Sequence, residues 1–428
     1  MASRIYPALI LVFVAAAGTR LAFLHFAGAG NLTPPGDYHG LSNSLLANWT
    51  YVDKSIPAQF GFPTDLQRPP GYPFFLYLIN PSSGVNPARV AFIQSILGGI
   101  FAVFLAMMAT RLANARAGIM AGLFYAFDWV TIIHTPMLLA ETLYAIALTG
   151  AVLVFAFYLR DLKPACSMLA GVLLGAAALI KPVAELQLGA FVLAWVVQPR
   201  RRINGLAFIL GFALLVTPWM VRNYQRHQVY ALSTIDASSL YFYIAHGAES
   251  GLQGRDLAQR INAAEADWNA RSLSQAEKKE MMNDEAWKII RQRWATVIKQ
   301  SVIGFARTCL GTGRETLVKS GGAKGGGISS FWHTVLPLTQ IGLLWLLAIA
   351  GVGSFWRAGL APRPVVCLFA IVVLFALLPS ASPAGYCRFR VHAVPILCIL
   401  AAVGAWRIFS GDQMRFFRRL MEKRKTEK

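Results

Sequence analysis

Long apolar stretches recur along nearly the whole chain, and they constrain its fold more than any other feature. Many of them reach roughly 18 residues, enough for a helix to cross a bilayer core of about 30 Å. Of the 428 residues, 56% are apolar and only 14% are charged, which excludes a soluble globular protein. The sequence therefore predicts an all-α polytopic membrane protein.

We expect about ten transmembrane helices, with both termini in the cytoplasm. The predicted spans cover residues 6–28, 89–110, 116–133, 137–159, 165–181, 183–198, 203–222, 333–356, 364–381 and 391–409. With this orientation, every short cytoplasmic loop carries arginine or lysine, as the positive-inside rule requires. The first segment reaches full spanning length and contains Arg20, which favours a retained helix over a cleaved signal peptide. Arg20 faces either a partner or the outer headgroups.

The spans divide the chain into four parts. Residues 1–223 form an N-terminal bundle with a long outer loop at 29–88, and residues 224–332 form an extramembrane, mostly helical segment. Residues 333–410 return to the membrane, and a basic cytoplasmic tail occupies 411–428. The net charge of +20 gathers in the short loops and this tail. Such clusters set topology and contact anionic lipids, so nucleic acid is not the expected partner.

The extramembrane segment contains two recognisable patterns. Ser274-Gln-Ala-Glu277 is a capping box that opens a helix. Apolar residues from Ile290 to Phe305 then repeat at helical spacing, which predicts a helix lying on the outer membrane surface or on the bundle. The glycine-rich stretch 321–327 lacks the Gly-Lys-Ser/Thr ending of a phosphate loop, so we interpret it as a flexible loop, with a phosphate-cradling nest as the alternative.

Acidic and basic residues converge on the outer face from five loops or span ends. They are Asp37, Asp65 and Arg68 in loop 29–88, His134 and Glu141, Lys181 and Glu185, Arg222, and Arg388, Arg390 and His392. Arginine and lysine suit an anionic headgroup such as a phosphate, and a carboxylate suits a general base. This pattern favours a site at the membrane–water boundary for a substrate that is part lipid and part polar.

Each of these residues also has a structural alternative. Asp37 could cap a helix, Asp65 could belong to a turn, and Arg68 could pair with either of them. The start of a span favours a carboxylate such as Glu141 through the helix dipole. Lys181 and Arg222 could be snorkelling anchors. Arg388 and Arg390 run against the positive-inside rule, which favours a functional role for them.

Several motifs, taken in order, carry a resemblance to a known class. They are Asp37-Tyr38 after the first span, Arg-Pro-Pro-Gly-Tyr-Pro at 68–73, Met137-Leu-Leu-Ala-Glu141-Thr142, Pro-Trp-x-x-Arg-Asn-Tyr at 218–224, and Arg388-Phe389-Arg390 followed by Pro395. The chain resembles a membrane glycosyltransferase of the GT-C class, specifically the bacterial branch related to protein mannosyltransferases and aminoarabinose transferases. Phe389 stands where that class usually has a tyrosine.

The resemblance implies transfer of a sugar from a polyprenyl-phosphate carrier to an envelope acceptor on the outer side of the inner membrane. Asp37 would be the catalytic base of an inverting displacement. Arg68, Arg388 and Arg390 would bind the donor phosphate, with Lys181 and Arg222 as further candidates. Tyr38, Glu141 and Tyr72 would bind the acceptor or the sugar. The acceptor would be a lipid, a protein or a polysaccharide.

Other functions stay open at the level of the sequence. A lipid or solute transporter and a non-catalytic scaffold of envelope assembly are the alternatives outside enzymes. Within enzymes, the nearest rival is a ligase that moves a whole glycan from polyprenyl diphosphate. No cofactor is expected. A divalent metal is possible, but no second carboxylate adjoins Asp37, and the five cysteines lack metal-ligand spacing. Cys309 and Cys387 could form a disulfide.

Overall fold

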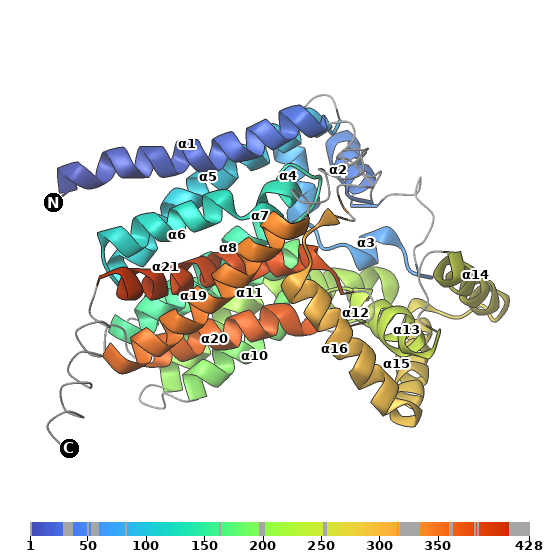
Figure 1. Cartoon of the computed structure of the whole chain (residues 1–428). Helices are drawn as coiled ribbons and strands as arrows, with labels where there is room; N and C mark the ends of the chain where they lie inside the picture. Colours follow the sequence, from blue (N-terminus) through green and yellow to red (C-terminus); the bar gives the residue numbers. More distant parts are fainter. Residues whose placement is uncertain are drawn as a thin grey trace, which may run out of the picture.

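The protein is a bundle of helices, and one end of the bundle carries a second layer of shorter helices (Figure 1). The computed structural model describes residues 2–28, 37–48, 51–52, 60–81, 84–161, 164–196, 202–250, 255–314, 316, 334–358, 363–380, 382 and 385–410. All the regular elements of this part of the chain are helices. The predicted all-α membrane fold is thereby confirmed.

Every predicted span corresponds to a helix in the structure. These helices are α1 (Ala2–Ala27), α5 (Pro87–Leu112), α6 (Ala115–Phe127) with α7 (Trp129–His134), α8 (Glu141–Asp161), α9 (Pro164–Ile180), α10 (Ala184–Val196), α11 (Arg202–His227), α19 (Leu336–Ala358), α20 (Arg363–Leu377) and α21 (Val394–Phe409). Within α1, α5, α11 and α19, the apolar stretch is long enough by itself to cross a membrane. The other apolar helices are shorter.

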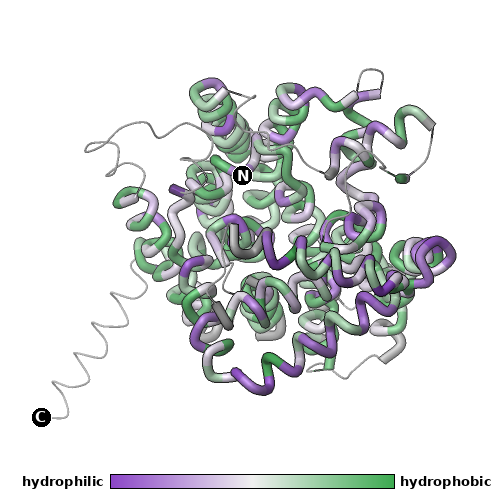
Figure 2. Tube along the Cα trace, turned by 90° about the vertical axis from the view of Figure 1, so that its right-hand side faces the viewer, coloured by the Kyte–Doolittle hydropathy of each residue, from purple (hydrophilic) through white to green (hydrophobic). Residues whose placement is uncertain are grey.

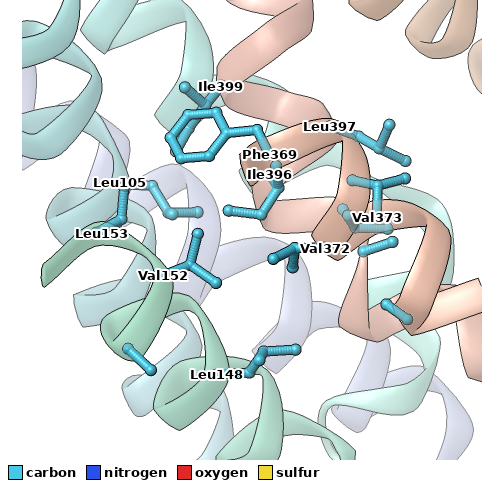
Figure 3. Packing of buried hydrophobic residues seen from close by; sticks show 14 of the residues in the cluster. Leu105, Leu148, Val152, Leu153, Phe369, Val372, Val373, Ile396, Leu397 and Ile399 are labelled. Carbon is cyan, nitrogen blue, oxygen red and sulfur yellow. The ribbon is translucent and has the colours of Figure 1, made fainter. Parts of the chain in front are cut away.

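The bundle helices pack closely because small residues line several of their contacts. Helix α9 packs along α11, where a Cβ on Gly171 would lie 2.0 Å from the carbonyl oxygen of Phe208. Helix α19 packs along α21 in the same way, with Gly404 against the Leu347 carbonyl oxygen. Such close backbone approach supports helix association in lipid, where apolar burial alone gives little driving force. Figure 3 shows the core between α5, α8, α20 and α21 filled by aliphatic side chains and Phe369.

The remaining elements gather at one end of the bundle. They are α2 (Asp37–Asn48), α3 (Thr64–Gln67), α4 (Gly71–Ile79), α12 (Ile235–Ser238), the π-helix η2 (Ser239–His246), α13 (Gly247–Ser250), α14 (Arg255–Ala270), α15 (Gln275–Gln292), α16 (Trp294–Leu310), and the 3₁₀-helices η4 (Leu378–Ser380) and η5 (Cys387–His392). In Figure 1, α12 to α16 lie on the right, whereas α1 begins and α21 ends on the left. Figure 2 looks onto the right-hand end, where hydrophilic segments stand in front of the apolar bundle.

The outer loop and the extramembrane segment share a small core of their own. Phe62 and Leu66 from the loop pack with Trp268 of α14 and Phe242 of η2. Gly61 has a left-handed φ of +77°, and a Cβ there would lie 2.5 Å from the Trp268 ring. Its backbone N–H also donates to Glu265 Oε1 over 2.7 Å. Only glycine combines this dihedral with this contact, so the loop is held against α14 at a defined point.

Two local predictions for the extramembrane segment have different outcomes. The capping box at Ser274 is present, with both the side-chain and the backbone hydrogen bond to Glu277. The apolar repeat from Ile290 to Phe305 does not form one continuous helix, because the chain breaks at Arg293, whose φ is −125° and ψ is 30°. The repeat is therefore divided between α15 and α16.

The predicted span 116–133 is also interrupted, and Arg20 explains how the bundle tolerates the break. Helix α6 ends at Phe127, and the Asp128 side chain caps α7 by accepting from the Thr131 N–H over 2.8 Å. The fully buried Arg20 guanidinium donates to the carbonyl oxygens of Tyr125 and Ala126, at 3.2 and 3.4 Å. Arg20 thus faces partners inside the bundle and satisfies carbonyls at the end of a helix.

We expect Arg20→Lys to destabilise the bundle, because a lysine ammonium cannot reproduce the forked donors that reach Thr131, Tyr125 and Ala126. Each lost charged hydrogen bond costs about 1.5–3 kcal/mol, so thermal unfolding in detergent should begin at a clearly lower temperature. The matched control is Arg111→Lys at an exposed position. Equal unfolding temperatures for Arg20→Lys and wild type would contradict the assignment.

Candidate functional site

The Arg-Pro-Pro-Gly motif holds Arg68 at the junction of two short helices. Helix α3 ends at Gln67, the next residue Arg68 is extended, and α4 begins after Pro70. The Tyr51 hydroxyl donates to the carbonyl oxygens of Arg68 and Pro69, at 2.7 and 3.0 Å. A Cβ on Gly71 would lie 2.7 Å from the Leu179 carbonyl oxygen, so the motif approaches the end of α9 at a position open only to glycine. The backbone at Arg68 is thereby held in place.

Glu141 is the first residue of α8, and Lys181 follows the last residue of α9. The Lys181 ammonium donates to Glu141 Oε1 over 2.8 Å. The same oxygen lies 3.0 Å from Arg388 Nε, which the 3₁₀-helix η5 supplies. The Glu141 side chain is only 4% exposed, so a single buried carboxylate is shared by two cations. A buried carboxylate stays ionised only when it is paired in this way.

Arg68 adds a third positive charge to this group. Its charge acts on both Lys181 and Arg388, which places the three cations within electrostatic range of one another. We call Arg68, Lys181, Arg388 and Glu141 the cation cluster. One carboxylate cannot neutralise both Lys181 and Arg388. The cluster can therefore accept an anionic group such as a phosphate, for which arginine offers two parallel donors.

Aromatic rings surround the cations of this cluster. The Arg68 guanidinium lies 5.4 Å from the centroid of the Tyr38 ring, which meets Tyr72 edge to face at 4.9 Å. Arg388 lies 5.1 Å from the Tyr386 ring, and Lys181 lies 5.5 Å from the Phe389 ring. Burial raises the pKa of Tyr386 to about 12, so its phenol is neutral at physiological pH. Because a cation–π contact needs only a ring face, Phe389 can serve here in place of tyrosine.

Arg222 belongs to a different cluster, which fastens the outer loop to α11. Its guanidinium contacts Asp65 Oδ2 at 2.5 Å and the Tyr51 carbonyl oxygen at 2.9 Å. His227 Nε2 lies 3.0 Å from the same Asp65 oxygen. We call Asp65, Arg222 and His227 the loop clamp. Burial opposes the ionisation of Asp65, but hydrogen bonds from His227 and Arg222 outweigh it and lower the pKa of this carboxyl.

Arg390 also has partners that are structural. Its fully buried guanidinium donates to the carbonyl oxygens of Thr308, Cys309 and Gly311, at 2.8, 2.7 and 3.1 Å. These carbonyls close the C-terminus of α16, where a cation is favoured by the helix dipole. The structure thus brings Arg68, Lys181 and Arg388 together, while Arg222 and Arg390 hold other elements. The disulfide considered for Cys309 and Cys387 is not formed in the structure.

Some predicted residues fall outside what the structure describes. Helix α2 begins at Asp37, but the Asp37 side chain lies outside the described residues, as do the glycine-rich stretch 321–327 and the tail 411–428. Tyr38 and Tyr72 are described. Among the side chains that the structure does describe, no group of three histidine, cysteine, aspartate or glutamate residues is arranged to hold a metal ion.

The structure adds residues that sequence reasoning missed. Gln94 accepts from the Tyr72 hydroxyl over 3.1 Å and donates to the carbonyl oxygens of Thr135 and Met137. The sequence contains one indication of this role: Gln94 is a glutamine within the apolar span 89–110, where a buried polar group requires hydrogen-bond partners. The π-helix η2 supplies Tyr243, on whose phenol the charges of Arg68 and Arg388 act. No motif pointed to Tyr243, because only the fold brings it to the cluster.

The loop clamp predicts a pH-dependent stability. Since the pKa of Asp65 is lower in the folded chain, its contribution is complete above the ordinary aspartate pKa of about 4 and is lost as the pH falls through the folded value. We expect Asp65→Asn to lower Tm at pH 7, with the difference from wild type shrinking below about pH 4. Asp267→Asn, at an exposed helical pair, serves as the matched control. A Tm difference that is constant with pH would argue against the clamp.

Comparisons with known proteins agree with this architecture. Residues 67–221 match the model of the dolichyl-phosphate-mannose-protein mannosyltransferase family, a range that includes Arg68, Glu141 and Lys181. Curated protein sequences give no match. Among solved structures, the apo oligosaccharyltransferase of Archaeoglobus fulgidus is 13% identical with a TM-score of 0.55, over 97% of this chain and 52% of that chain.

Two further structures are similar at lower scores. The oligosaccharyltransferase AglB from Archaeoglobus fulgidus, in complex with an inhibitory peptide and a dolichol-phosphate, is 14% identical with a TM-score of 0.51, over 97% of this chain and 52% of that chain. ArnT from Cupriavidus metallidurans bound to undecaprenyl phosphate is 14% identical with a TM-score of 0.40, over 95% of this chain and 79% of that chain. This chain spans about half the length of the two archaeal structures. The resemblance drawn from the motifs is thereby confirmed: the chain has the GT-C membrane fold, and its residues 67–221 match the dolichyl-phosphate-mannose-protein mannosyltransferase family.

Proposed function

We propose that this protein is an integral-membrane glycosyltransferase that moves a sugar from a polyprenyl-phosphate carrier to an envelope acceptor. The observation that carries the proposal is the cation cluster, in which Lys181 and Arg388 share the single buried carboxylate of Glu141 and Arg68 lies within electrostatic range of both cations. It lies among the elements at the outer end of an apolar bundle, where a lipid chain and a polar headgroup can be bound together. The family match over residues 67–221 and the dolichol-phosphate in the AglB complex support the same donor class.

In the proposed reaction, an acceptor hydroxyl attacks the anomeric carbon of the donor sugar. The new C–O bond forms as the bond from that carbon to the phosphate oxygen breaks, which inverts the configuration. Asp37 takes the proton of the hydroxyl, and polyprenyl phosphate leaves with the electron pair of the broken bond. Arg68, Lys181 and Arg388 neutralise the negative charge that develops on this phosphate.

Other residues serve this chemistry by holding or surrounding the reacting groups. Glu141 positions Lys181 and Arg388 while the phosphate is absent and balances part of their charge. Tyr38 and Tyr72 bind the sugar or the acceptor, and Tyr243 is a further candidate from η2. Arg222 and Arg390 act through structure: Arg222 fastens the outer loop, and Arg390 fastens α16 beside η5.

The topology that fits this reaction has the termini in the cytoplasm of a bacterial cell and the site on the outer side of the inner membrane. The basic cytoplasmic loops of the sequence support this orientation. A donor presented at the outer leaflet would reach the cation cluster from the lipid, and an envelope lipid, protein or polysaccharide would reach it from water. A protease or thiol-labelling map of the loops in intact cells tests the orientation.

The decisive experiment follows donor consumption directly. Purified protein in nanodiscs is given a panel of polyprenyl-phosphate sugars and a membrane extract as acceptor, and release of polyprenyl phosphate is measured by mass spectrometry. We expect turnover of one donor class and its loss in Asp37→Asn. The control is Asp284→Asn, at an exposed position of α15. Turnover retained in Asp37→Asn would exclude Asp37 as the base, and no turnover of any donor would favour a transporter or a scaffold.

A second candidate is a ligase that transfers a whole glycan from polyprenyl diphosphate. The observation that favours it is the likeness in fold to the archaeal oligosaccharyltransferases, which at 13–14% identity is a likeness of fold alone. The same panel distinguishes the two candidates when diphosphate-linked glycans are included. Release of polyprenyl diphosphate would replace the first proposal with the second.

The cation cluster makes a separate prediction. Arg388→Gln keeps a polar side chain with an N–H donor but loses the charge, so we expect kcat/KM for the donor to fall by roughly 10²-fold or more. Glu141 keeps its pair with Lys181, which limits the damage to the fold. Arg307→Gln, at an exposed position of α16, is the matched control. A similar loss in both variants would show that the effect is not specific to the cluster.

A further inference from the structure

Helix α16 presents an apolar stripe that no described element covers. Trp294, Ile298 and Val302 follow one another at four-residue intervals, so they lie on one side of the helix. They are 63%, 54% and 62% exposed, although they are large and apolar. A contiguous stripe of this kind usually marks a surface that another molecule covers.

An adjacent side of α16 is fixed to the rest of the protein, so the stripe cannot turn inward. Val297, Gly304 and Thr308 are buried there. A Cβ on Gly304 would lie 1.8 Å from the Ser382 carbonyl oxygen, so the backbones touch at this point. Arg390 holds the last carbonyls of the helix, as described above. The stripe therefore faces outward as long as the fold is intact.

The position of α16 indicates what lies against the stripe. The helix contacts η4, η5, α19 and α20 at the outer end of the bundle. In Figure 1 it runs obliquely from that end toward α15. Helix α19 exposes Leu343, Leu346 and Ile349, which are apolar side chains of a membrane-spanning helix. The stripe and this lipid-facing side thus belong to neighbouring helices at the boundary of the membrane.

Charge identifies the kind of surface. Lys299 is exposed on α16, and Arg291 and Arg293 are exposed just before the helix begins. From Trp294 to Leu310 the sequence contains no aspartate or glutamate. An apolar stripe bordered only by cations matches a leaflet of anionic lipid, where the apolar side chains enter the headgroup boundary and the cations meet phosphates.

We propose that α16 is an interfacial helix that docks its Trp294–Ile298–Val302 stripe onto the anionic lipid surface at the outer side of the membrane. The contact is separate from the cation cluster and does not depend on sugar transfer. It would add a second attachment to the bilayer on the helix whose C-terminus Arg390 ties to η5. Because η5 also carries Arg388, the membrane would then support one wall of the candidate site.

The test measures the depth of α16 in a lipid bilayer. Ile298→Cys and Thr296→Cys are each labelled with a fluorophore in nanodiscs of phosphatidylglycerol and phosphatidylcholine, and wild type gives the background from native cysteines. Thr296 is the matched control, because it is exposed on the other side of α16. We expect lipids spin-labelled at the headgroup to quench the label at 298 at least twofold more than the label at 296.

Two results would overturn the proposal. One is equal lipid quenching at 298 and 296. The other is a label at 298 that is shielded from aqueous quencher but not reached by lipid quencher, which would assign the stripe to a second copy of the protein or another partner.

The role of charge is tested by Lys299→Glu, which should lower lipid quenching of the label at 298 in bilayers that contain phosphatidylglycerol but not in pure phosphatidylcholine. Lys288→Glu, exposed on α15, is its control, and equal effects of both variants would remove the anionic lipid from the proposal.

Discussion

The cost of burying charge organises the end of the bundle where the cation cluster lies. An unpaired carboxylate or guanidinium inside a bundle is strongly disfavoured, so each one must have a partner within hydrogen-bond reach. Glu141 satisfies this requirement with two cations on one oxygen, one from the residue after α9 and the other from the first turn of η5. Three segments far apart in the sequence are thereby drawn to one point. The charge left over at that point gives the cluster its capacity for an anion.

Two other buried arginines have backbone carbonyl oxygens, not carboxylates, as their hydrogen-bond partners. Arg20 satisfies the end of α6, and Arg390 satisfies the end of α16. In both places a helix ends inside the protein, so its last carbonyl oxygens would otherwise lack donors. The forked guanidinium reaches several carbonyls at once, which a lysine cannot do. A buried arginine in this fold therefore marks either a helix end or an anion site, and its partners decide which.

This distinction also explains what the sequence could and could not predict. The spans and the capping box at Ser274 follow from local patterns, and the structure contains them. Arg388 and Arg390 stand two residues apart and look equivalent in sequence, yet one meets Glu141 and the other meets α16. Their different roles depend on a 3₁₀-helix and on which segment lies beside it. The role of Tyr243 could not be predicted from the sequence either, because only the tertiary fold brings η2 close enough for the charges of Arg68 and Arg388 to act on its phenol.

The loop clamp connects these observations to function. Asp65 and Arg68 stand three residues apart in the outer loop, so the pair between Asp65 and Arg222 restrains the backbone that carries Arg68. Tyr51 contributes to both sides, because its carbonyl oxygen accepts from Arg222 and its hydroxyl donates to the Arg68 carbonyl. A cation that must meet a phosphate gains from being held before the ligand arrives, since ordering it then costs less. The motif residues at 218–224 thus contribute to the candidate site without touching its ligand.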